Sequence, residues 1–120
     1  MKRRVYLMEF KGLDTDERFY KVGVTFKYPA ESRFPQDDPV RRHYSIKEIR
    51  SKSLAPDAAE SLETHLIVER DARGYSYMPL VTFDGDGECL VHRQEALDFV
   101  MDYLNKSAYD LEGEFGRPAW

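Results

Sequence analysis

The chain has little of the chemistry that builds disulfide scaffolds or zinc sites. It contains one cysteine, Cys89, and three scattered histidines. One thiol cannot form an internal disulfide, and this set lacks the paired spacing of zinc ligands. We therefore expect Cys89 to be a buried structural residue rather than a reactive one.

Long apolar runs are also missing. No segment approaches the ~18 apolar residues that a membrane-spanning helix needs. The first four residues, Met-Lys-Arg-Arg, lead into a segment too short and too polar for a signal peptide. We expect a cytoplasmic protein with no membrane partner.

What is present is the composition of one folded domain with an uneven charge distribution. The 120 residues are 42% hydrophobic and 33% charged, with a net charge of -4. Residues 1–53 carry a net charge of +5, whereas residues 54–120 carry -9. Such a chain can present a basic face to DNA, although a solvated surface of mixed charge is the plainer interpretation. The densest basic stretch comprises Arg41, Arg42, His43, Lys47, Arg50 and Lys52.

Three segments have the composition of β-strands. Residues 4–10 and 19–25 are rich in aromatic and β-branched residues, and turn-forming residues separate them. This pattern predicts an antiparallel hairpin. Residues 44–51 predict a third strand, and the prolines within residues 28–40 predict a loop with one short helical turn.

The clearest helix begins at Pro56 and ends near Gly74. Glu63 lies four residues after Ala59 and three before Leu66, so its carboxylate emerges on or beside the apolar stripe of this helix. A carboxylate carried inward needs a cation, a metal or a hydrogen-bond donor. The alternative is that Glu63 lies at the edge of the stripe and reaches water or an arginine.

A second amphipathic helix is expected from residue 92 or 93 to residue 105. The predicted fold is therefore mixed α+β, with a small central antiparallel sheet of about three strands flanked by helices. We expect a single domain over residues 1–106 and an irregular tail over residues 107–120.

This order of elements resembles the GIY-YIG endonuclease superfamily. Small phage-type members read Tyr-Lys-Ile-Gly-x-Thr in the second half of the signature, and this chain reads Tyr-Lys-Val-Gly-Val-Thr over residues 20–25. A later family pattern, Phe-x-Gly-x-x-Glu-Cys-Phe, is similar to Phe-Asp-Gly-Asp-Gly-Glu-Cys-Leu over residues 83–90. The resemblance covers roughly residues 4–90.

The resemblance implies roles for individual residues. Tyr6 takes the place of the tyrosine of the first motif, and Lys21 that of the tyrosine of the second. Gly23 matches the motif glycine, Arg33 the arginine that contacts the scissile phosphate, and Glu63 the glutamate that binds Mg²⁺ or Mn²⁺. Tyr6, or Lys21 if burial lowers its pKa, is expected to help deprotonate the attacking water.

Two departures from the family pattern bear on activity rather than on fold. Val5 stands where the first motif has glycine, and Lys21 replaces a tyrosine. The resemblance implies a small metal-dependent DNA endonuclease or nickase, encoded by a phage or another mobile element and acting in the host cytoplasm. The alternative is a weak or inactive module on the same scaffold that binds DNA or a protein partner.

A domain this small offers limited area for reading a long DNA site, so the basic 41–52 segment, a homodimer or a protein partner would have to supply specificity.

Overall fold

A four-stranded antiparallel sheet in the order β3-β1-β2-β4 forms the centre of the computed structural model, which describes residues 1–116. The strands are β1 (Arg3–Gly12), β2 (Arg18–Thr25), β3 (Tyr44–Leu54) and β4 (Cys89–Val91). The predicted mixed α+β fold and the predicted hairpin are confirmed, since β1 pairs with β2 in antiparallel fashion. The short fourth strand is added at one edge.

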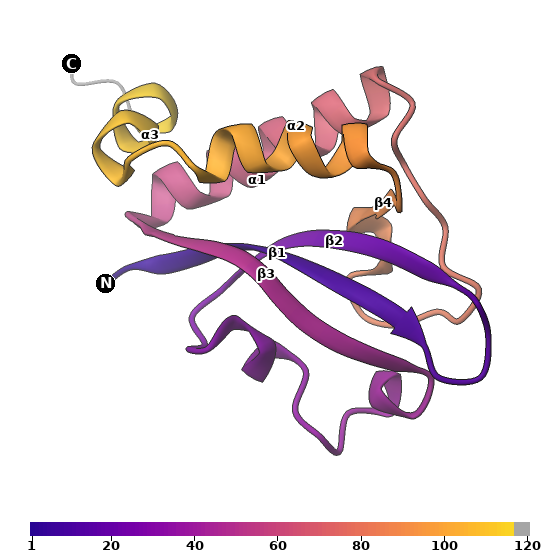
Figure 1. Ribbon diagram of the computed structural model, residues 1–120. Coiled ribbons are helices and arrows are strands. Elements are labelled where there is room, and N and C mark those ends of the chain that lie inside the picture. Colours follow the sequence, from indigo (N-terminus) through magenta and orange to yellow (C-terminus); the bar gives the residue numbers. More distant parts are fainter. Residues whose placement is uncertain (117–120) are drawn as a thin grey trace.

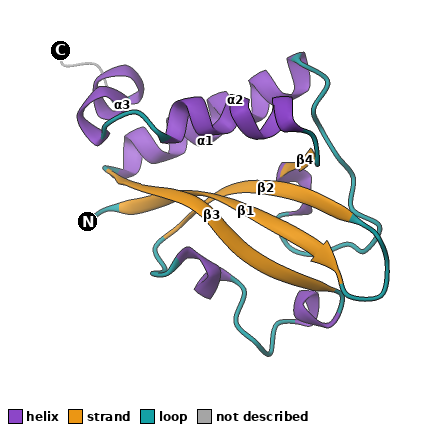
Figure 2. Ribbon diagram, in the orientation of Figure 1, coloured by secondary structure: helices purple, strands orange, loops and turns teal. Residues whose placement is uncertain are grey.

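Both faces of the sheet are covered, as Figures 1 and 2 show. Three helices lie on one face: α1 (Pro56–Ala72), α2 (Gln94–Leu104) and α3 (Ala108–Phe115). The chain between β2 and β3, with the short 3-10 helices η1 (Ala30–Arg33) and η2 (Pro39–Arg42), covers the other. None of the helices in the described part of the chain has the length and apolar character needed to cross a membrane.

The alternation of β1 explains why two layers are needed. Val5 and Leu7 point to the helices, whereas Tyr6 and Phe10 point to the layer that contains η1 and η2. Side chains alternate in this way along any strand, so a strand that is apolar at consecutive positions has to be buried on both faces. The second layer is rich in aromatic rings: Phe10 stacks on Phe19 with ring centroids 5.0 Å apart.

The third strand contains a bulge. Leu7 pairs with Arg50 and Met8 pairs with Glu48, which leaves Ile49 as the extra residue. Ile46 packs in the aromatic layer, and Ile49 packs against the helices. The third strand predicted over residues 44–51 is therefore present, and it continues to Leu54.

The two predicted helices are present, but the predicted irregular tail is wrong for residues 108–115. These residues form α3, whose first turn is capped by Ser107, with the Oγ atom accepting a hydrogen bond of 3.1 Å from the backbone N–H of Asp110. Leu111 is fully buried against the helical core, and Glu112 accepts a hydrogen bond from the backbone N–H of Ala55. The helix forms because it gains this tertiary packing, which no short isolated helix has. Residues 117–120 of the predicted tail lie outside the described residues.

Candidate functional site

The candidate site lies at the edge of the sheet, beside the part of β2 that has no partner in β4. The short β4 pairs only with residues 19–21 of β2, so residues 22–25 of β2 form an outer edge among the described strands. A pocket of about 540 Å³ opens at this edge. Its lining includes Tyr6, Lys21, Arg33 and Glu63, which come from β1, β2, η1 and α1. The structure therefore brings together four residues that the sequence singles out.

Tyr6 and Gly23 fit one another across the hairpin. They are direct partners in the register of β1 and β2. The ring of Tyr6 lies over Gly23 so closely that a β-carbon on residue 23 would stand 2.2 Å from the hydroxyl oxygen of Tyr6. Only glycine leaves room for the ring at this position. The predicted pair of motif residues thus forms one packing unit.

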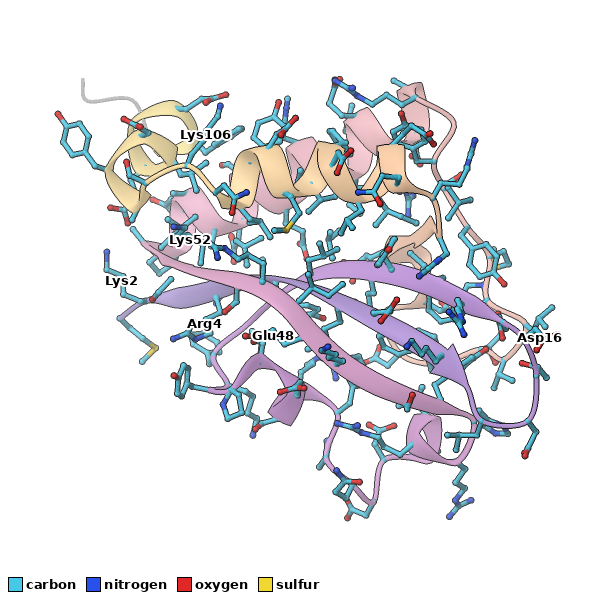
Figure 3. The ribbon with its side chains drawn as sticks, in the orientation of Figure 1. Lys2, Arg4, Asp16, Glu48, Lys52 and Lys106 are labelled. Atoms are coloured by element: carbon cyan, nitrogen blue, oxygen red, sulfur yellow. The ribbon has the colours of Figure 1, made fainter. Side chains whose placement is uncertain are left out.

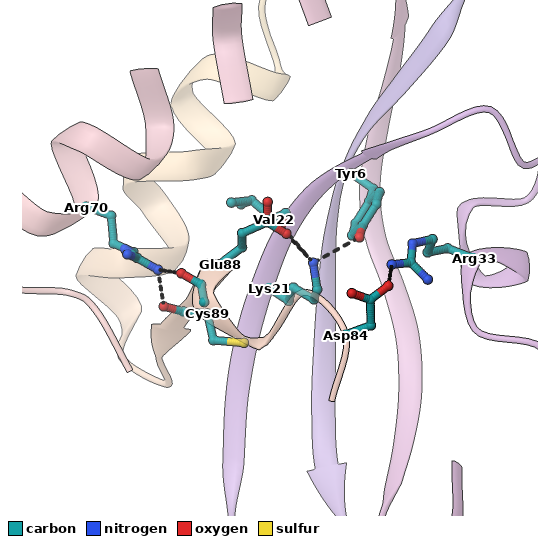
Figure 4. A network of polar contacts seen from close by, with 9 residues as sticks. Tyr6, Lys21, Val22, Arg33, Arg70, Asp84, Glu88 and Cys89 are labelled. Atoms are coloured by element: carbon teal, nitrogen blue, oxygen red, sulfur yellow. Dashed lines mark hydrogen bonds and ion pairs between the residues drawn. The ribbon is translucent and has the colours of Figure 1, made fainter. Parts of the chain in front are cut away.

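Lys21 is the most unusual buried residue, with only 1% of its surface exposed. Its Nζ atom donates hydrogen bonds to the hydroxyl of Tyr6 at 3.1 Å, to the backbone carbonyl of Val22 at 3.2 Å and to Oε1 of Glu88 at 2.8 Å. Figure 4 shows the ammonium group between Val22 and Tyr6. All three protons of the ammonium group therefore have acceptors.

These contacts decide the protonation of Lys21. Burial works to lower its pKa, but the interactions with Tyr6 and with the carboxylate of Glu88 outweigh burial and raise the pKa above its usual value. Lys21 was expected to act as a base only if burial lowers its pKa. Its pKa is raised instead, so this condition is not met. Burial also raises the pKa of Tyr6, against the opposing effect of Lys21. At neutral pH the pair is a lysine cation and a neutral phenol.

Glu63 reaches the pocket from the middle of α1. Burial raises the pKa of its carboxyl group to about 7, with further contributions from the charge of Glu88 and a hydrogen bond between the two carboxyl groups. Lys21 opposes this shift. Glu63 thus lies beside the apolar stripe of α1, partly exposed in the pocket, and the partner that the sequence did not identify is Glu88.

Two carboxyl groups that meet in a half-buried pocket are what a divalent cation with oxygen ligands requires. No cluster of three or more potential metal ligands occurs among residues 1–116. Mg²⁺ nevertheless binds through one or two carboxylates and keeps several waters. The negative charge of Glu88 contributes to the raised pKa of Glu63, so a positive charge is favoured between the two groups. Glu63 and Glu88 therefore fit the ion that the family resemblance implies, and they would be the residues that hold it.

Arg33 stands at the outer rim of the pocket. Its guanidinium group forms an ion pair of 2.8 Å with Asp84, whose side chain is 91% exposed, and lies 4.8 Å from the ring centroid of Phe34. Figure 4 shows Arg33 directed toward Asp84, beside Tyr6. An exposed ion pair of this kind contributes little to stability, so a phosphate can replace the carboxylate at low cost.

Arg70 positions the segment that carries Glu88. Its Nη1 atom donates to the backbone carbonyls of Gly87 at 2.8 Å and of Cys89 at 3.0 Å. These bonds join the end of α1 to the short helix η3 (Asp86–Glu88) and to β4. Cys89 is fully buried, as predicted. Gly85, at φ 89°, lets the chain pass close to Lys21.

Glu88 and Arg70 are thus residues that sequence reasoning did not single out. Glu88 had a signal, since it is the glutamate of the pattern over residues 83–90. Arg70 had none, because a lone arginine near the end of a helix normally faces solvent.

The six basic residues predicted to bind DNA do not line this pocket in the described chain. Arg41 donates through Nε to the backbone carbonyl of Phe34 at 2.9 Å and so has a structural bond. Lys47, Arg50 and Lys52 lie on β3, the outer strand at the opposite edge of the sheet. Figure 3 shows Lys52 at the end of the sheet that also carries Lys2 and Arg4. Arg42 and His43 are exposed near η2, and the DNA-binding role of all six stays a prediction.

Comparisons of this chain with protein-family models, curated proteins and solved structures find no match. What the pocket does has to follow from its own chemistry.

Proposed function

We propose that this chain is a small metal-dependent DNA endonuclease or nickase of the GIY-YIG type that hydrolyses phosphodiester bonds. One observation carries the proposal: Tyr6, Lys21, Arg33 and Glu63 come from four separate elements and line a single pocket. Their chemistry is what phosphodiester hydrolysis needs, namely cations for the phosphoryl oxygens and oxygen ligands for a metal. An origin in a phage or another mobile element is part of the same proposal.

The residues of the pocket would divide the work as follows. Arg33 exchanges Asp84 for the scissile phosphate and binds two of its oxygens. Lys21 remains charged and stabilises negative charge that develops on the phosphoryl group. The hydroxyl oxygen of Tyr6 already accepts a hydrogen bond from Lys21, so the hydroxyl hydrogen is free to bond a phosphate oxygen or the attacking water. When bound, Mg²⁺ or Mn²⁺ would supply an activated water and a Lewis acid.

The test is cleavage of supercoiled plasmid and phage DNA in the presence of Mg²⁺, Mn²⁺ or EDTA. Wild type is expected to nick or cut in either metal and not in EDTA, and Glu63→Ala is expected to lose this activity. A matched control is Glu69→Ala, because Glu69 lies on the same helix and pairs with Arg73 away from the pocket. Cleavage that survives in Glu63→Ala would contradict the proposed mechanism.

Metal binding can be tested separately from activity. Mn²⁺ is expected to raise the Tm of wild type through binding to the folded state, and to leave the Tm of Glu63→Ala unchanged. The same thermal shift in both proteins would exclude Glu63 as a ligand.

A second candidate is a non-catalytic module that holds DNA or a protein partner. It is favoured by one observation: each cation of the pocket already has a carboxylate partner, as in the pairs Lys21 with Glu88 and Arg33 with Asp84. Binding to DNA with a steep salt dependence and no cleavage in Mn²⁺ would select this function. Affinity for a protein without any effect of salt would indicate an inhibitor or adaptor.

A further inference from the structure

Two large aromatic side chains stand in solvent on the loop that leaves β2. Phe26 is 59% exposed and Tyr28 is 76% exposed, although the neighbouring layer of the protein buries most of its aromatic rings. Exposed rings of this size are unfavourable in water unless they contact a partner.

Each ring is paired with an arginine of β1. The guanidinium carbon of Arg3 lies 4.3 Å from the ring centroid of Phe26, and that of Arg4 lies 4.1 Å from the ring centroid of Tyr28. These are cation–π contacts. Because Arg3 and Arg4 are consecutive residues of β1, they hold Phe26 on the face of the sheet that carries the helices and Tyr28 on the other face. Arg4 is also fixed through a hydrogen bond of 2.9 Å to the hydroxyl of Ser51. The Nε atom of Arg3 is buried and has no hydrogen-bond partner among the described residues, so the ring and an ion pair with Glu60 hold this side chain.

The charge along the loop that carries the rings is positive, and acids come only at its end, where Glu31 follows Ala30 and the side chain of Glu48 accepts a hydrogen bond from the backbone N–H of Ala30. Residues 18–30 contain no Asp or Glu, and Lys27 lies between the two rings in sequence. Figure 3 places Lys2, Arg4 and Lys52 at this end of the sheet. The acids that contact this group, Glu60 on Arg3 and Glu112 on Lys2, form ion pairs with partly exposed atoms, which salt or a phosphate can replace.

The rings are also connected to the candidate site. Arg3 lines the pocket that contains Tyr6 and Glu63, and the same side chain covers Phe26. Val24, which belongs to the strand that leads into the loop, lines the pocket as well. A polymer that lies on Phe26 would therefore continue into the pocket.

We propose that Phe26 and Tyr28, one on each face of the sheet, form a two-part stacking platform for unpaired nucleotides and that Arg3, Arg4 and Lys27 bind their phosphates. The inference rests on the proposed function in taking DNA as the ligand, and it narrows the substrate to DNA with a single-stranded stretch next to the cleaved bond. Bases stack on aromatic rings without regard to sequence, and cations along the strand bind its backbone. Paired bases inside a duplex do not offer their faces to such rings.

The experiment measures fluorescence anisotropy of a labelled oligo(dT) of about 15 nucleotides, close to the upper site size of small single-strand binders. It uses Glu63→Gln protein in EDTA, so that cleavage does not interfere. A duplex of the same length is the comparison ligand. The ring variants are Phe26→Ala, Tyr28→Ala and the double substitution, each in the Glu63→Gln background. Tyr109→Ala is the matched control, since Tyr109 is 86% exposed on α3.

Each ring variant is expected to weaken binding of the single strand by about fivefold or more, because stacking contributes that much per base. Tyr109→Ala should leave it unchanged, and Tyr28→Phe should retain most of it. The duplex should bind more weakly than the single strand. Thermal unfolding of each variant checks that the fold is intact.

Two results would overturn the platform: equal affinity of the Glu63→Gln protein and of the double ring variant for oligo(dT), or tighter binding of duplex than of single strand. Absence of single-strand binding at low salt would also overturn it and would assign the rings to a protein partner. The proposed nuclease activity and the stacking platform are contradicted by different results. Ring-dependent binding without cleavage in Mn²⁺ leaves the platform in place, whereas cleavage with ring-independent binding removes only the platform.

Discussion

At the scale of single residues, the clearest feature is the fit between Gly23 and Tyr6. A short motif match usually says little, because Tyr-Lys-Val-Gly occurs by chance in many strands. Here the glycine has a physical reason that no motif states: the tyrosine of the neighbouring strand occupies the space of its side chain. The tyrosine in turn carries its hydroxyl to Lys21. The absence of a side chain at Gly23 therefore determines where the hydroxyl group of Tyr6 lies in the pocket.

Gly23→Ala is expected to destabilise the protein by about 2 to 3 kcal/mol, because the added methyl group has to displace a packed ring. Urea unfolding measures the difference. Gly113→Ala on α3 is the control, since nothing lies within 4 Å of the added atom. That substitution should stabilise by roughly 0.5 to 1 kcal/mol through helix propensity. Equal unfolding midpoints for Gly23→Ala and wild type would show that the ring moves aside freely.

Glu63 makes stability depend on pH in an unusual direction. Its pKa in the folded protein is about 7, raised from 4.5 by burial and by Glu88. Between these values the folded state keeps a proton that the unfolded state releases. Stability is therefore lost as pH rises through this window, and the loss is complete above pH 7.

Glu63→Gln removes this loss. Without metal, the variant is expected to be more stable than wild type by roughly 1 to 2 kcal/mol at about pH 8, after allowance for solvent screening of a half-buried group. The gain should shrink toward about pH 5, where the native carboxyl group is protonated. Urea unfolding at the two pH values measures it, and Glu69→Gln is the control. A gain that is equal at both pH values would contradict the pKa argument.

At the scale of elements, the segment after α1 is held by side chains rather than by regular structure. Residues 75–88 have few backbone hydrogen bonds of the sheet type, and their end is fixed by Arg70 through two backbone carbonyls. This arrangement places Glu88 against Lys21 and Glu63. One buried guanidinium group thus contributes two of the contacts that hold the end of this segment at the pocket.

Arg70→Met is expected to lower the free energy of unfolding by about 2 to 3 kcal/mol, because two buried carbonyls lose their donors. Hydrogen exchange should also become faster at residues 85–91, where the backbone N–H of Val91 bonds to the carbonyl of Tyr75. Arg73→Met, three residues away in an exposed ion pair with Glu69, is the control. Unchanged exchange in Arg70→Met would show that the segment is held elsewhere.

The elements differ in how far the sequence predicts them. The hairpin and α1 carry strong local signals: strand formers on either side of a turn, and a proline start with a glycine stop. The resemblance to a family pattern also singled out four residues that line one pocket in the structure. By contrast, α3 and β4 are short and depend on tertiary contacts such as the burial of Leu111 and the pairing of β4 with residues 19–21. The partnership of Glu63 with Glu88 could not be predicted, because it joins elements 25 residues apart whose separation only the fold determines.

At the scale of the whole molecule, the two outer strands have different surroundings. The pocket opens at the β2 edge, and the basic residues predicted to bind DNA follow the β3 edge. Lys52 pairs with Val5 near the start of β1, whereas Lys47 pairs with Glu9 toward the other end. Five residues of strand separate these lysines by about 17 Å. The end of the sheet that carries Arg3, Arg4 and Lys52 is the one continuous with the pocket.

Lys52→Ala is therefore expected to reduce the slope of log Kd for DNA against log salt concentration by about 1, as for a lost phosphate contact. Lys47→Ala, a lysine on the same strand, should leave the slope unchanged. Both are measured by anisotropy with a duplex that carries a single-stranded end. A larger effect of Lys47 would place the DNA along the whole β3 edge.

The burial of Cys89 has a practical consequence. Its thiol is buried, and burial raises its pKa to about 12. Maleimide reagents need an accessible thiolate and will therefore not react with it. A cysteine introduced at Asp16, in the exposed turn at the far end of the molecule from Lys2 (Figure 3), can then be labelled alone, with the native thiol left in place. A dye at that position reports the distance to a fluorophore on bound DNA, and so reads out which end of the sheet the nucleic acid occupies.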